Sequence, residues 1–341
     1  MTHEAYSDGP SGWLRQWAAA WDRFWFTPQR ASTLAVIRIA CGAMLAYVHL
    51  VWASVISDFL GARAWLTADV VRQLHRNDWA WSWLWYTEHP GWLAAHQAVA
   101  IVASLLMMAG CLTRLAAPLA WWMTLMVCHR LTGALFGLDQ VVVMLAMYLM
   151  LSHCGSELSW DAWWRQRCLA RGGRTGGCDV TAGWGRWLFP APQASVANNV
   201  ATRLIQLHLC VIYLFGGLSK MRGEMWFDGS ALWYTVVNYE YQSLDLTWLG
   251  RWRMAIALLT ALTIFWETFY IALVWPRLTR PLALGMALLV HGGIAVALGM
   301  VTFGTIMIVA NLAFISPASI GRLSQRRVNL AKDRSAQALP N

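Results

Sequence analysis

The feature that most constrains this chain is the recurrence of apolar runs of about 20 residues along nearly its whole length. An α-helix needs roughly 20 apolar residues to cross the hydrocarbon core of a bilayer, and it satisfies its own backbone hydrogen bonds there. The 341-residue sequence is 58% hydrophobic and only 13% charged, and it contains 24 Trp. These observations predict an all-α integral membrane protein and argue against two soluble domains.

The apolar runs predict about eight transmembrane helices. The last two form one long run, which we divide near Gly299 because a single helix would be longer than a bilayer is thick. The predicted spans are 31–59, 92–111, 115–136, 138–154, 199–219, 253–275, 281–299 and 301–316. Residues 12–27 place tryptophans at helical spacing among charges, which predicts an N-terminal amphipathic helix in the membrane interface or a cytoplasmic extension of the first span.

Charge placement predicts the orientation. With both termini cytoplasmic, basic residues of the inner segments clearly outnumber those of the outer segments, as the positive-inside rule requires. We therefore expect an interfacial segment at 1–30, a transmembrane domain at 31–318 with an inner flexible linker at 155–198, and a basic cytoplasmic tail at 319–341. The net charge of +9 then reflects topology, since no basic stripe interleaved with stacking aromatics indicates a nucleic-acid partner.

Several other classes of protein find no support in the sequence. The seven cysteines include no CxxC pair, which argues against a zinc site or a disulfide framework. The histidines in or near the predicted spans show no haem-ligating spacing on one helix, and there is no HExxH motif or phosphate-binding glycine loop. No metal is predicted. The start of the chain lacks a cleavable signal pattern, so we expect the first span to insert uncleaved.

Lys220 is the candidate chemical centre. The chain has 26 basic residues, and only Lys220 and Lys332 among them are lysines. A desolvated lysine can give up its proton, whereas an arginine in a protein cannot. Lys220 ends a stripe of residues at helical spacing, formed by Arg203, Gln206, Cys210, Tyr213 and Gly217. The stripe predicts either the wall of a cavity or a polar packing seam that ends in a snorkelling lysine.

Ionisable residues within spans are expensive to keep there and usually face the bundle interior. Arg130 ends the third predicted span, and Asp139 opens the fourth across a short outer turn. This arrangement predicts an Arg130–Asp139 ion pair that closes the hairpin, in preference to a catalytic role for Asp139.

Glu267 and His291 are the ionisable residues of the sixth and seventh predicted spans. We expect Glu267 to neutralise Arg38 or Arg203, which come from the inner halves of their helices, rather than to transfer protons. His291 is either a proton relay or a hydrogen-bonded core residue. Both residues are expected nearer the middle of the membrane than Lys220.

The order of these features resembles the transmembrane domain of vitamin K-dependent γ-glutamyl carboxylase and its bacterial relatives, the HTTM (horizontally transferred transmembrane) proteins. The resemblance covers roughly residues 30–318. Its pieces are Ile37-Arg38-Ile39 with Gly42, Gly110-Cys-Leu-Thr-Arg114, Leu158-Ser-Trp-Asp161, Tyr213-Leu-Phe-Gly-Gly-Leu-Ser-Lys-Met221 with Trp226 and Gly229, then Glu267, His291 and Leu298-Gly-Met300.

The resemblance implies that Lys220 is the general base that starts oxygenation of a reduced quinone cofactor. The strongly basic oxygenated species would then remove a γ-proton from glutamate, to which carbon dioxide adds. A quinone or hydroquinone of the vitamin K type, arriving from the bilayer, is thus the expected cofactor. The expected site residues are Lys220, His291, Asp139 and Glu267 for catalysis and Tyr213, Gly217 and Trp226 for the cofactor.

The chain also departs from the family pattern. The carboxylase has a histidine where Asp139 aligns, and its large lumenal domain has no counterpart here. We therefore expect a quinone-linked modification of a peptide or small molecule at the outer face of a bacterial inner membrane. The alternative from another class is a non-enzymatic membrane component of a secreted-peptide maturation or export complex, in which Lys220 is an anchoring charge. A third is a DoxX-like quinone-linked redox partner.

Overall fold

The computed structural model describes residues 10–172, 174–175 and 178–321, and these residues form helices joined by loops and one short hairpin. Five helices are long and apolar enough to cross a membrane, which confirms the prediction of an α-helical membrane protein. They are α2 (Ser32–Ser54), α5 (Pro90–Ala109), α10 (Val196–Lys220), α13 (Arg253–Leu273) and α14 (Arg280–Ala297).

Three further helices occupy the remaining predicted spans, namely α6 (Thr113–Arg130), α7 (Gly137–Met150) and α15 (Val301–Asn311), which continues into the 3₁₀ turn η3 (Leu312–Phe314). The predicted division near Gly299 is confirmed, since this glycine adopts φ +67° between α14 and α15. The first predicted span is longer than its helix. It breaks at Val55, and the short α3 (Ile56–Phe59) follows.

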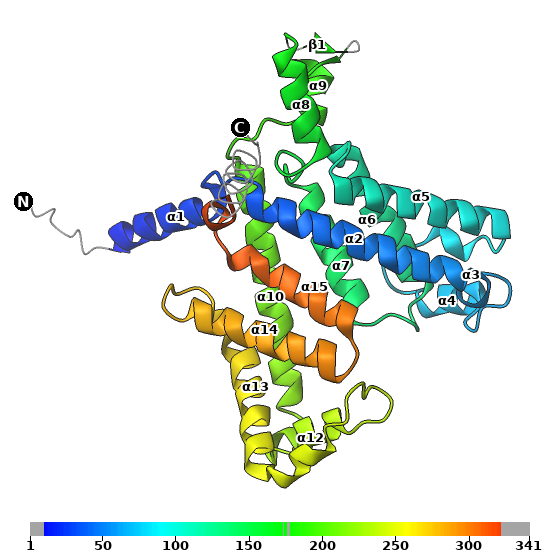
Figure 1. The fold of residues 1–341 in the computed structure, drawn as a ribbon, viewed down its shortest axis with the longest axis vertical. Coiled ribbons are helices and arrows are strands. Elements are labelled where there is room, and N and C mark those ends of the chain that lie inside the picture. The colour runs from blue at the N-terminus through cyan, green and yellow to red at the C-terminus, as the bar shows by residue number, and fades with distance from the viewer. Residues whose placement is uncertain (1–9, 173, 176–177, 322–341) are drawn as a thin grey trace, which may run out of the picture.

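The membrane helices form two groups, within each of which neighbouring helices pack together (Figure 1). The first group is α2, α5, α6 and α7, and the second group is α10, α13 and α14. In Figure 1, α10 and α13 run along the long axis of the molecule, while α2 and α5 run across it. Helix α15 packs against α2 and α7 of the first group and against α10 and α14 of the second, so it joins the two.

The connecting segments gather at opposite ends of this bundle. One end carries α1 (Pro10–Phe26), α8 (Trp160–Ala170) and α9 (Gly183–Leu188). The other carries the long loops with α3, α4 (Ala68–Leu74) and the 3₁₀ turn η1 (Trp83–Trp85), and with α11 (Glu224–Phe227), α12 (Ala231–Val236) and the 3₁₀ turn η2 (Thr247–Arg251). Successive membrane helices therefore alternate in direction between the two ends.

The predicted linker 155–198 contains α8, α9 and the hairpin of β1 (Arg174–Thr175) with β2 (Cys178–Asp179). Arg165 of α8 donates hydrogen bonds to the carbonyls of Val180 (2.6 Å) and Phe189 (2.8 Å), which ties the described parts of this segment together. Most of the predicted tail, from residue 322 onward, and the first nine residues of the predicted N-terminal segment lie outside the described residues.

The N-terminal helix predicted at 12–27 is confirmed as α1. It packs against the start of α10, where the Asn199 amide donates to the carbonyls of Phe24 (2.7 Å) and Trp25 (2.8 Å). Trp13, Trp17 and Trp21 remain exposed along the helix. Exposed tryptophans beside a membrane helix suit the bilayer interface, where an aromatic ring is partly desolvated.

Candidate functional site

The centre of the candidate site is an ion pair between α10 and α13. Lys220 Nζ, at the last residue of α10, lies 2.5 Å from Glu267 Oε2 of α13. The side chains are 28% and 10% exposed, so the carboxylate is nearly enclosed while the ammonium keeps some access. The Trp226 ring lies under the ammonium, 5.4 Å from Nζ to the ring centroid. The structure thus brings together three of the predicted site residues.

Two consecutive glycines shape the wall of this site. A Cβ on Gly217 would collide with Thr268 of α13 and lie 2.8 Å from its backbone nitrogen, so Gly217 permits the close contact of α10 with α13. A Cβ on Gly216 would instead lie 3.5 Å from Glu267 Oε2 and 3.9 Å from Lys220 Nζ. The missing side chain at Gly216 leaves one side of the ion pair uncovered by α10.

The pairing of Glu267 differs from our expectation. We expected Glu267 to neutralise Arg38 or Arg203 deeper in the membrane, and that prediction is wrong. Arg203 donates to Gln206 (2.9 Å) and stacks its guanidinium on Phe24 (4.4 Å to the ring centroid). Because its carboxylate contacts Lys220 Nζ, Glu267 lies at the same level of the helix bundle as the Lys220 ammonium. A lysine side chain extends several ångströms beyond its Cα, and the sequence alone could not place that reach.

A second polar cluster surrounds Tyr213, which lies two helical turns before Lys220 on α10. The rise between Tyr213 and Lys220 along α10 is about 10 Å. The Tyr213 hydroxyl lies 2.8 Å from His291 Nε2 of α14 and accepts a hydrogen bond from Asn311 Nδ2 of α15 at 2.8 Å. The Tyr270 hydroxyl of α13 donates to Asn311 Oδ1 at 2.6 Å. All four side chains are buried.

The sequence reasoning missed Asn311 and Tyr270. The available signal was weak, because neither residue is charged and a tyrosine in a membrane helix usually marks the interface. Asn311 is nevertheless an amide within an apolar run, and a buried amide in a membrane must find hydrogen-bond partners. That rule flags Asn311 as a residue with partners on other helices.

Asp139 is not part of this cluster. Its carboxylate accepts a hydrogen bond from the backbone nitrogen of Phe136 at 3.1 Å and caps the start of its own helix α7. The predicted Arg130–Asp139 ion pair is wrong, since Arg130 Nη1 donates to the carbonyl of Leu66 at 2.9 Å and its other guanidinium nitrogens are buried without a hydrogen-bond partner. The backbone N–H groups at the start of a helix have no partner within the helix, so they can donate to a carboxylate there. Asp139 therefore requires no charged partner.

Arg38 lies where three of the sequence motifs come together, those around residues 37–42, 110–114 and 158–161. This arginine is fully buried, and its guanidinium donates to the carbonyls of Met107 (2.6 Å), Met108 (2.8 Å), Leu158 (2.7 Å) and Cys154 (3.2 Å). Two of these carbonyls belong to the last turn of α5, and that of Met107 also accepts from the backbone nitrogen of Gly110 at 3.2 Å. Arg38 thus fastens α2 to the end of α5 and to the loop after α7.

Asp161 completes this junction. Its carboxylate accepts hydrogen bonds from the backbone nitrogens of Leu112 (2.7 Å) and Thr113 (2.8 Å) and from the Thr113 hydroxyl (2.7 Å), at the start of α6. Burial raises the pKa of the Asp161 carboxyl, while these hydrogen bonds and the Arg38 charge oppose the increase. Gly110 ends α5 with φ +70°, and a Cβ there would lie 2.7 Å from Arg38 Nη1.

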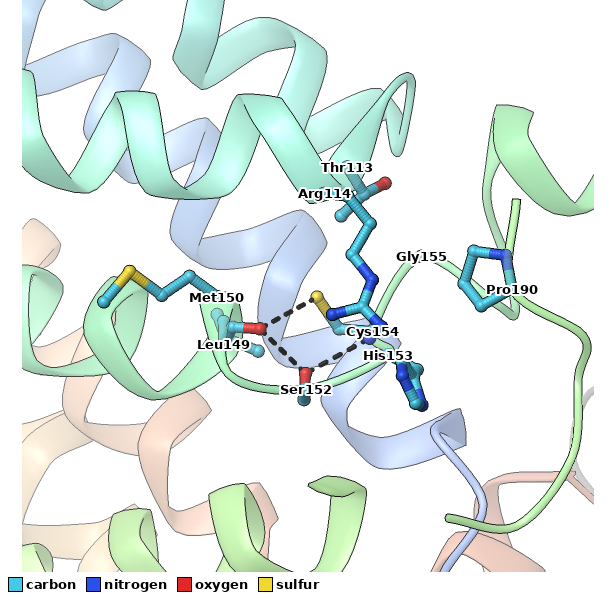
Figure 2. Close-up of a pocket in the computed structure, with 9 residues that line it drawn as sticks. All are labelled: Thr113, Arg114, Leu149, Met150, Ser152, His153, Cys154, Gly155 and Pro190. Carbon is cyan, nitrogen blue, oxygen red and sulfur yellow. Dashed lines mark hydrogen bonds between the residues drawn. The ribbon is translucent and has the colours of Figure 1, made fainter. Parts of the chain in front are cut away.

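Figure 2 shows a hollow beside the same junction, with Arg114 of α6 reaching over the loop after α7. Ser152 and Cys154 both donate to the carbonyl of Leu149, which closes the end of α7. The hollow measures about 10 Å³, which is room for one water molecule at most. This junction is therefore a structural element and offers no room for a substrate.

Another hollow, of about 410 Å³, lies on the first helix group at the end that carries α4 and η1. It is lined mainly by apolar and aromatic side chains, including Trp83, Trp92 and Met123. Its histidine, His96, is already bonded to Trp83 Nε1 (3.1 Å) and to the carbonyl of Met123 (3.2 Å). None of the predicted site residues lines it.

Fold and site together define a polytopic α-helical membrane protein with a polar side-chain network among its C-terminal helices. No protein-family model, curated protein or solved structure matches this chain. Within the described residues, no group of three or more histidine, cysteine, aspartate or glutamate side chains is placed to hold a metal ion.

Proposed function

We propose that this chain is an HTTM-type protein of a bacterial inner membrane, with eight spans, both termini in the cytoplasm and Lys220 at the outer face. Two observations support this orientation. The segment with α8 and α9, at the same end of the bundle as α1, carries five arginines, namely Arg165, Arg167, Arg171, Arg174 and Arg186. The loop that follows Lys220 belongs to the opposite end, with α11 and α12. The motif residues of the first group also converge, on Arg38.

We further propose that the Lys220–Glu267 pair is the acid–base centre of a quinone-linked enzyme that modifies a peptide or a small molecule. The observation that carries this proposal is the 2.5 Å contact between Lys220 Nζ and Glu267 Oε2. When the proton moves from the ammonium to the carboxylate, the pair becomes a neutral amine beside a neutral acid. A low-dielectric surrounding favours that uncharged state far more than water does.

The residues present fit a flat aromatic cofactor. Trp226 offers an aromatic face beside Nζ, and the absent side chain of Gly216 leaves the ion pair approachable along α10. A bound hydroquinone would supply a hydroxyl whose deprotonation prepares the ring for oxidation. The neutral Lys220 amine accepts that hydroxyl proton and becomes an ammonium again. Glu267 holds the amine in place and takes up the proton that the Lys220 ammonium releases before it acts as a base.

The test uses the purified protein in lipid nanodiscs without oxygen, with a short-chain 1,4-naphthohydroquinone as probe. Deprotonation of the probe changes its ultraviolet absorption, and binding is measured separately by equilibrium dialysis of the probe. Wild-type protein is expected to bind and deprotonate the probe. Lys220→Arg keeps the charge but cannot accept a proton, so it is expected to bind without the absorption change. An unchanged absorption shift in Lys220→Arg rules out Lys220 as the base.

One observation favours the non-enzymatic alternative, a membrane component of a secreted-peptide maturation or export complex. The loop after Lys220 exposes large aromatic side chains, including Phe227 (74% exposed) and Tyr239 (93% exposed), which a peptide could cover. In that case Lys220 is an anchoring charge held by Glu267. Lys220→Arg then retains full function in cells, while Tyr239→Ser with Phe227→Ser lowers recovery of a co-expressed secreted peptide.

A further inference from the structure

Four buried side chains form one continuous hydrogen-bonded chain across four helices. It runs from Tyr270 of α13 through Asn311 of α15 and Tyr213 of α10 to His291 of α14, and each link is between 2.6 and 2.8 Å. The four residues are at most 5% exposed. Because water has little access, each donor and acceptor in this chain must be matched by the others.

The carbonyl of Met307 sets the direction of this chain. Asn311 Nδ2 donates to that carbonyl at 2.8 Å. A carbonyl oxygen only accepts hydrogen bonds, so the amide nitrogen must lie on that side and the amide oxygen must face Tyr270. The Tyr270 hydroxyl therefore donates to Asn311 Oδ1, and the second Nδ2 proton of Asn311 goes to the Tyr213 oxygen.

The same matching fixes the proton on His291. The Tyr213 oxygen accepts from Asn311, so its own hydroxyl proton is free for its other neighbour, His291 Nε2, at 2.8 Å. An imidazole nitrogen that accepts a hydrogen bond carries no proton. The proton of neutral His291 is therefore on Nδ1. This nitrogen is buried and has no hydrogen-bond partner among the described residues.

A buried N–H group without an acceptor is unfavourable, and binding of an acceptor removes the penalty. His291 lies within electrostatic reach of Lys220, and Tyr213 lies within reach of Glu267, so the two polar clusters adjoin. Next to His291, the glycines Gly292 and Gly293 have open space where a Cβ would be. These glycines follow His291 around the helix, so α14 presents a surface without side chains at the two positions after the histidine.

We propose that His291 Nδ1–H is the donor that binds a carbonyl or hydroxyl oxygen of the quinone-type ligand, with Asn311 and Tyr270 as the positioning residues that hold the proton there. This inference rests on the proposed function for the identity of the ligand. The position of the proton on His291 depends only on the hydrogen bonds, so it can be tested without any activity.

The first test is ¹⁵N NMR of protein labelled at its histidine rings, with the His291 signals assigned from His291→Gln. A protonated and an unprotonated ring nitrogen resonate far apart. Wild-type protein is expected to show the proton on Nδ1 and none on Nε2. Asn311→Leu removes the constraint and is expected to give a mixture of the two tautomers. Tyr148→Phe is the matched control, because Tyr148 is bonded to a different histidine, His208, at 2.9 Å. A proton on Nε2 in wild-type protein overturns the inference.

The second test is binding of a short-chain 1,4-naphthoquinone to the protein in nanodiscs. His291→Leu removes the donor and is expected to weaken binding about tenfold, the effect of roughly one hydrogen bond. In His291→Asn the amide nitrogen replaces Nδ1, so affinity should stay close to wild type. Equal affinity of the leucine variant refutes the donor role. The base role of Lys220 is judged separately by its own absorption test, so either proposal can fail alone.

Discussion

Each helix group holds a cation, Arg38 or Lys220, where helices meet, and the two are neutralised in different ways. In the first group, Arg38 donates to four backbone carbonyls at the end of α5 and in the loop after α7. In the second group, Lys220 has one carboxylate partner, Glu267, and an aromatic ring beside it. A carbonyl cannot take up a proton, whereas a carboxylate can. The first arrangement can only hold helices together, while the second can also exchange a proton.

The buried histidines of the two groups, His49 and His291, also differ in how many of their ring nitrogens have a hydrogen-bond partner. His49 in the first group lies 2.8 Å from Gln97 and 3.0 Å from Thr124, so both of its ring nitrogens are satisfied. His291 in the second group has a partner on one nitrogen only. Complete satisfaction is typical of structural packing, and an unmatched buried group calls for a further explanation. Because the first group also contains unmatched buried groups, such as Gln97 Nε2 and Arg130 Nη2, this difference separates the two histidines and directs attention to His291.

The largest effect is expected from Arg38→Leu, which removes a hydrogen-bond donor from four carbonyls and leaves only that of Met107 with a backbone donor, Gly110. We expect a loss of at least about 3 kcal/mol in the free energy of unfolding, because each orphaned buried group costs about 1–3 kcal/mol. The measurement is thermal unfolding in detergent, followed by size-exclusion chromatography. Arg203→Leu is the matched control, since Arg203 has fewer hydrogen bonds and is partly exposed. If the two variants unfold at the same temperature, Arg38 is no more structural than Arg203.

The next effect concerns the ion pair. Lys220→Met leaves the nearly enclosed Glu267 carboxylate without its partner and should destabilise the protein by about 2 kcal/mol, a value reduced by the partial exposure of Lys220. The double variant Lys220→Met with Glu267→Leu should recover most of that loss, because two apolar side chains replace both charges. Unfolding midpoints of the four members of this cycle give the coupling. Additive losses contradict a direct interaction.

A smaller effect separates the two neighbouring glycines. Gly217→Ala forces the new methyl group against Thr268 and should cost about 1–2 kcal/mol, the usual range for overpacking. Gly216→Ala meets nothing closer than 3.5 Å and should leave stability unchanged. It should nevertheless hinder binding of the naphthoquinone probe, because the methyl group covers the ion pair. Equal unfolding midpoints for the two variants would show that α10 and α13 are not in close contact.

The smallest effect concerns the loop between α4 and η1 in the first group, whose stability should depend on pH through Asp78. The hydrogen bonds from His75 and from the backbone nitrogen of Ala80 lower the pKa of Asp78 below its ordinary value of 3.8. A lowered folded-state pKa means that the stabilisation is present above the ordinary value and is lost as pH falls through the folded-state value. His75 also contacts Thr132 at 2.8 Å, so this loss should loosen the loop.

Pepsin cleavage measures that change, because pepsin works in acid. Cleavage near residue 78 should accelerate as pH falls below about 4 in wild-type protein, and Asp78→Asn should be cleaved rapidly at every pH. Asp245→Asn is the control in the second group. The Thr247 hydroxyl and backbone lower the pKa of Asp245, but these contacts are local. Cleavage of the 78 region that does not depend on pH in wild-type protein contradicts the role of Asp78.

The sequence was sufficient for the positions of the helices, because apolar length and helical period depend on local composition. All eight predicted spans contain a helix, and the split near Gly299 follows from the length of the run. The stripe from Gln206 to Gly217 is also buried on one side of α10, as its spacing predicts.

The partners within the site were harder to predict, since they depend on depth and on contacts between distant helices. Lys220 and Glu267 are 47 positions apart, and the close packing of α10 against α13 together with the reach of the lysine side chain brings them together. Asp139 looked like a partner for Arg130 because the two are close in sequence, yet a carboxylate at a helix start prefers its own backbone. Asn311 carries no charge, so a search for ionisable residues passes over it.

Ser243 binds the long loop after Lys220 to the end of α14. Its backbone nitrogen donates to the carbonyl of Ala297 (3.1 Å) and its hydroxyl to the carbonyl of Val296 (2.6 Å), both in the last turn of α14. Carbonyls at a helix end have no partner within the helix, and lipid offers none. The segment around Ser243 therefore supplies hydrogen-bond donors to the carbonyls at the end of α14, and it is a structural part of the membrane domain. Deleting it to simplify the protein would open a helix end to hydrocarbon.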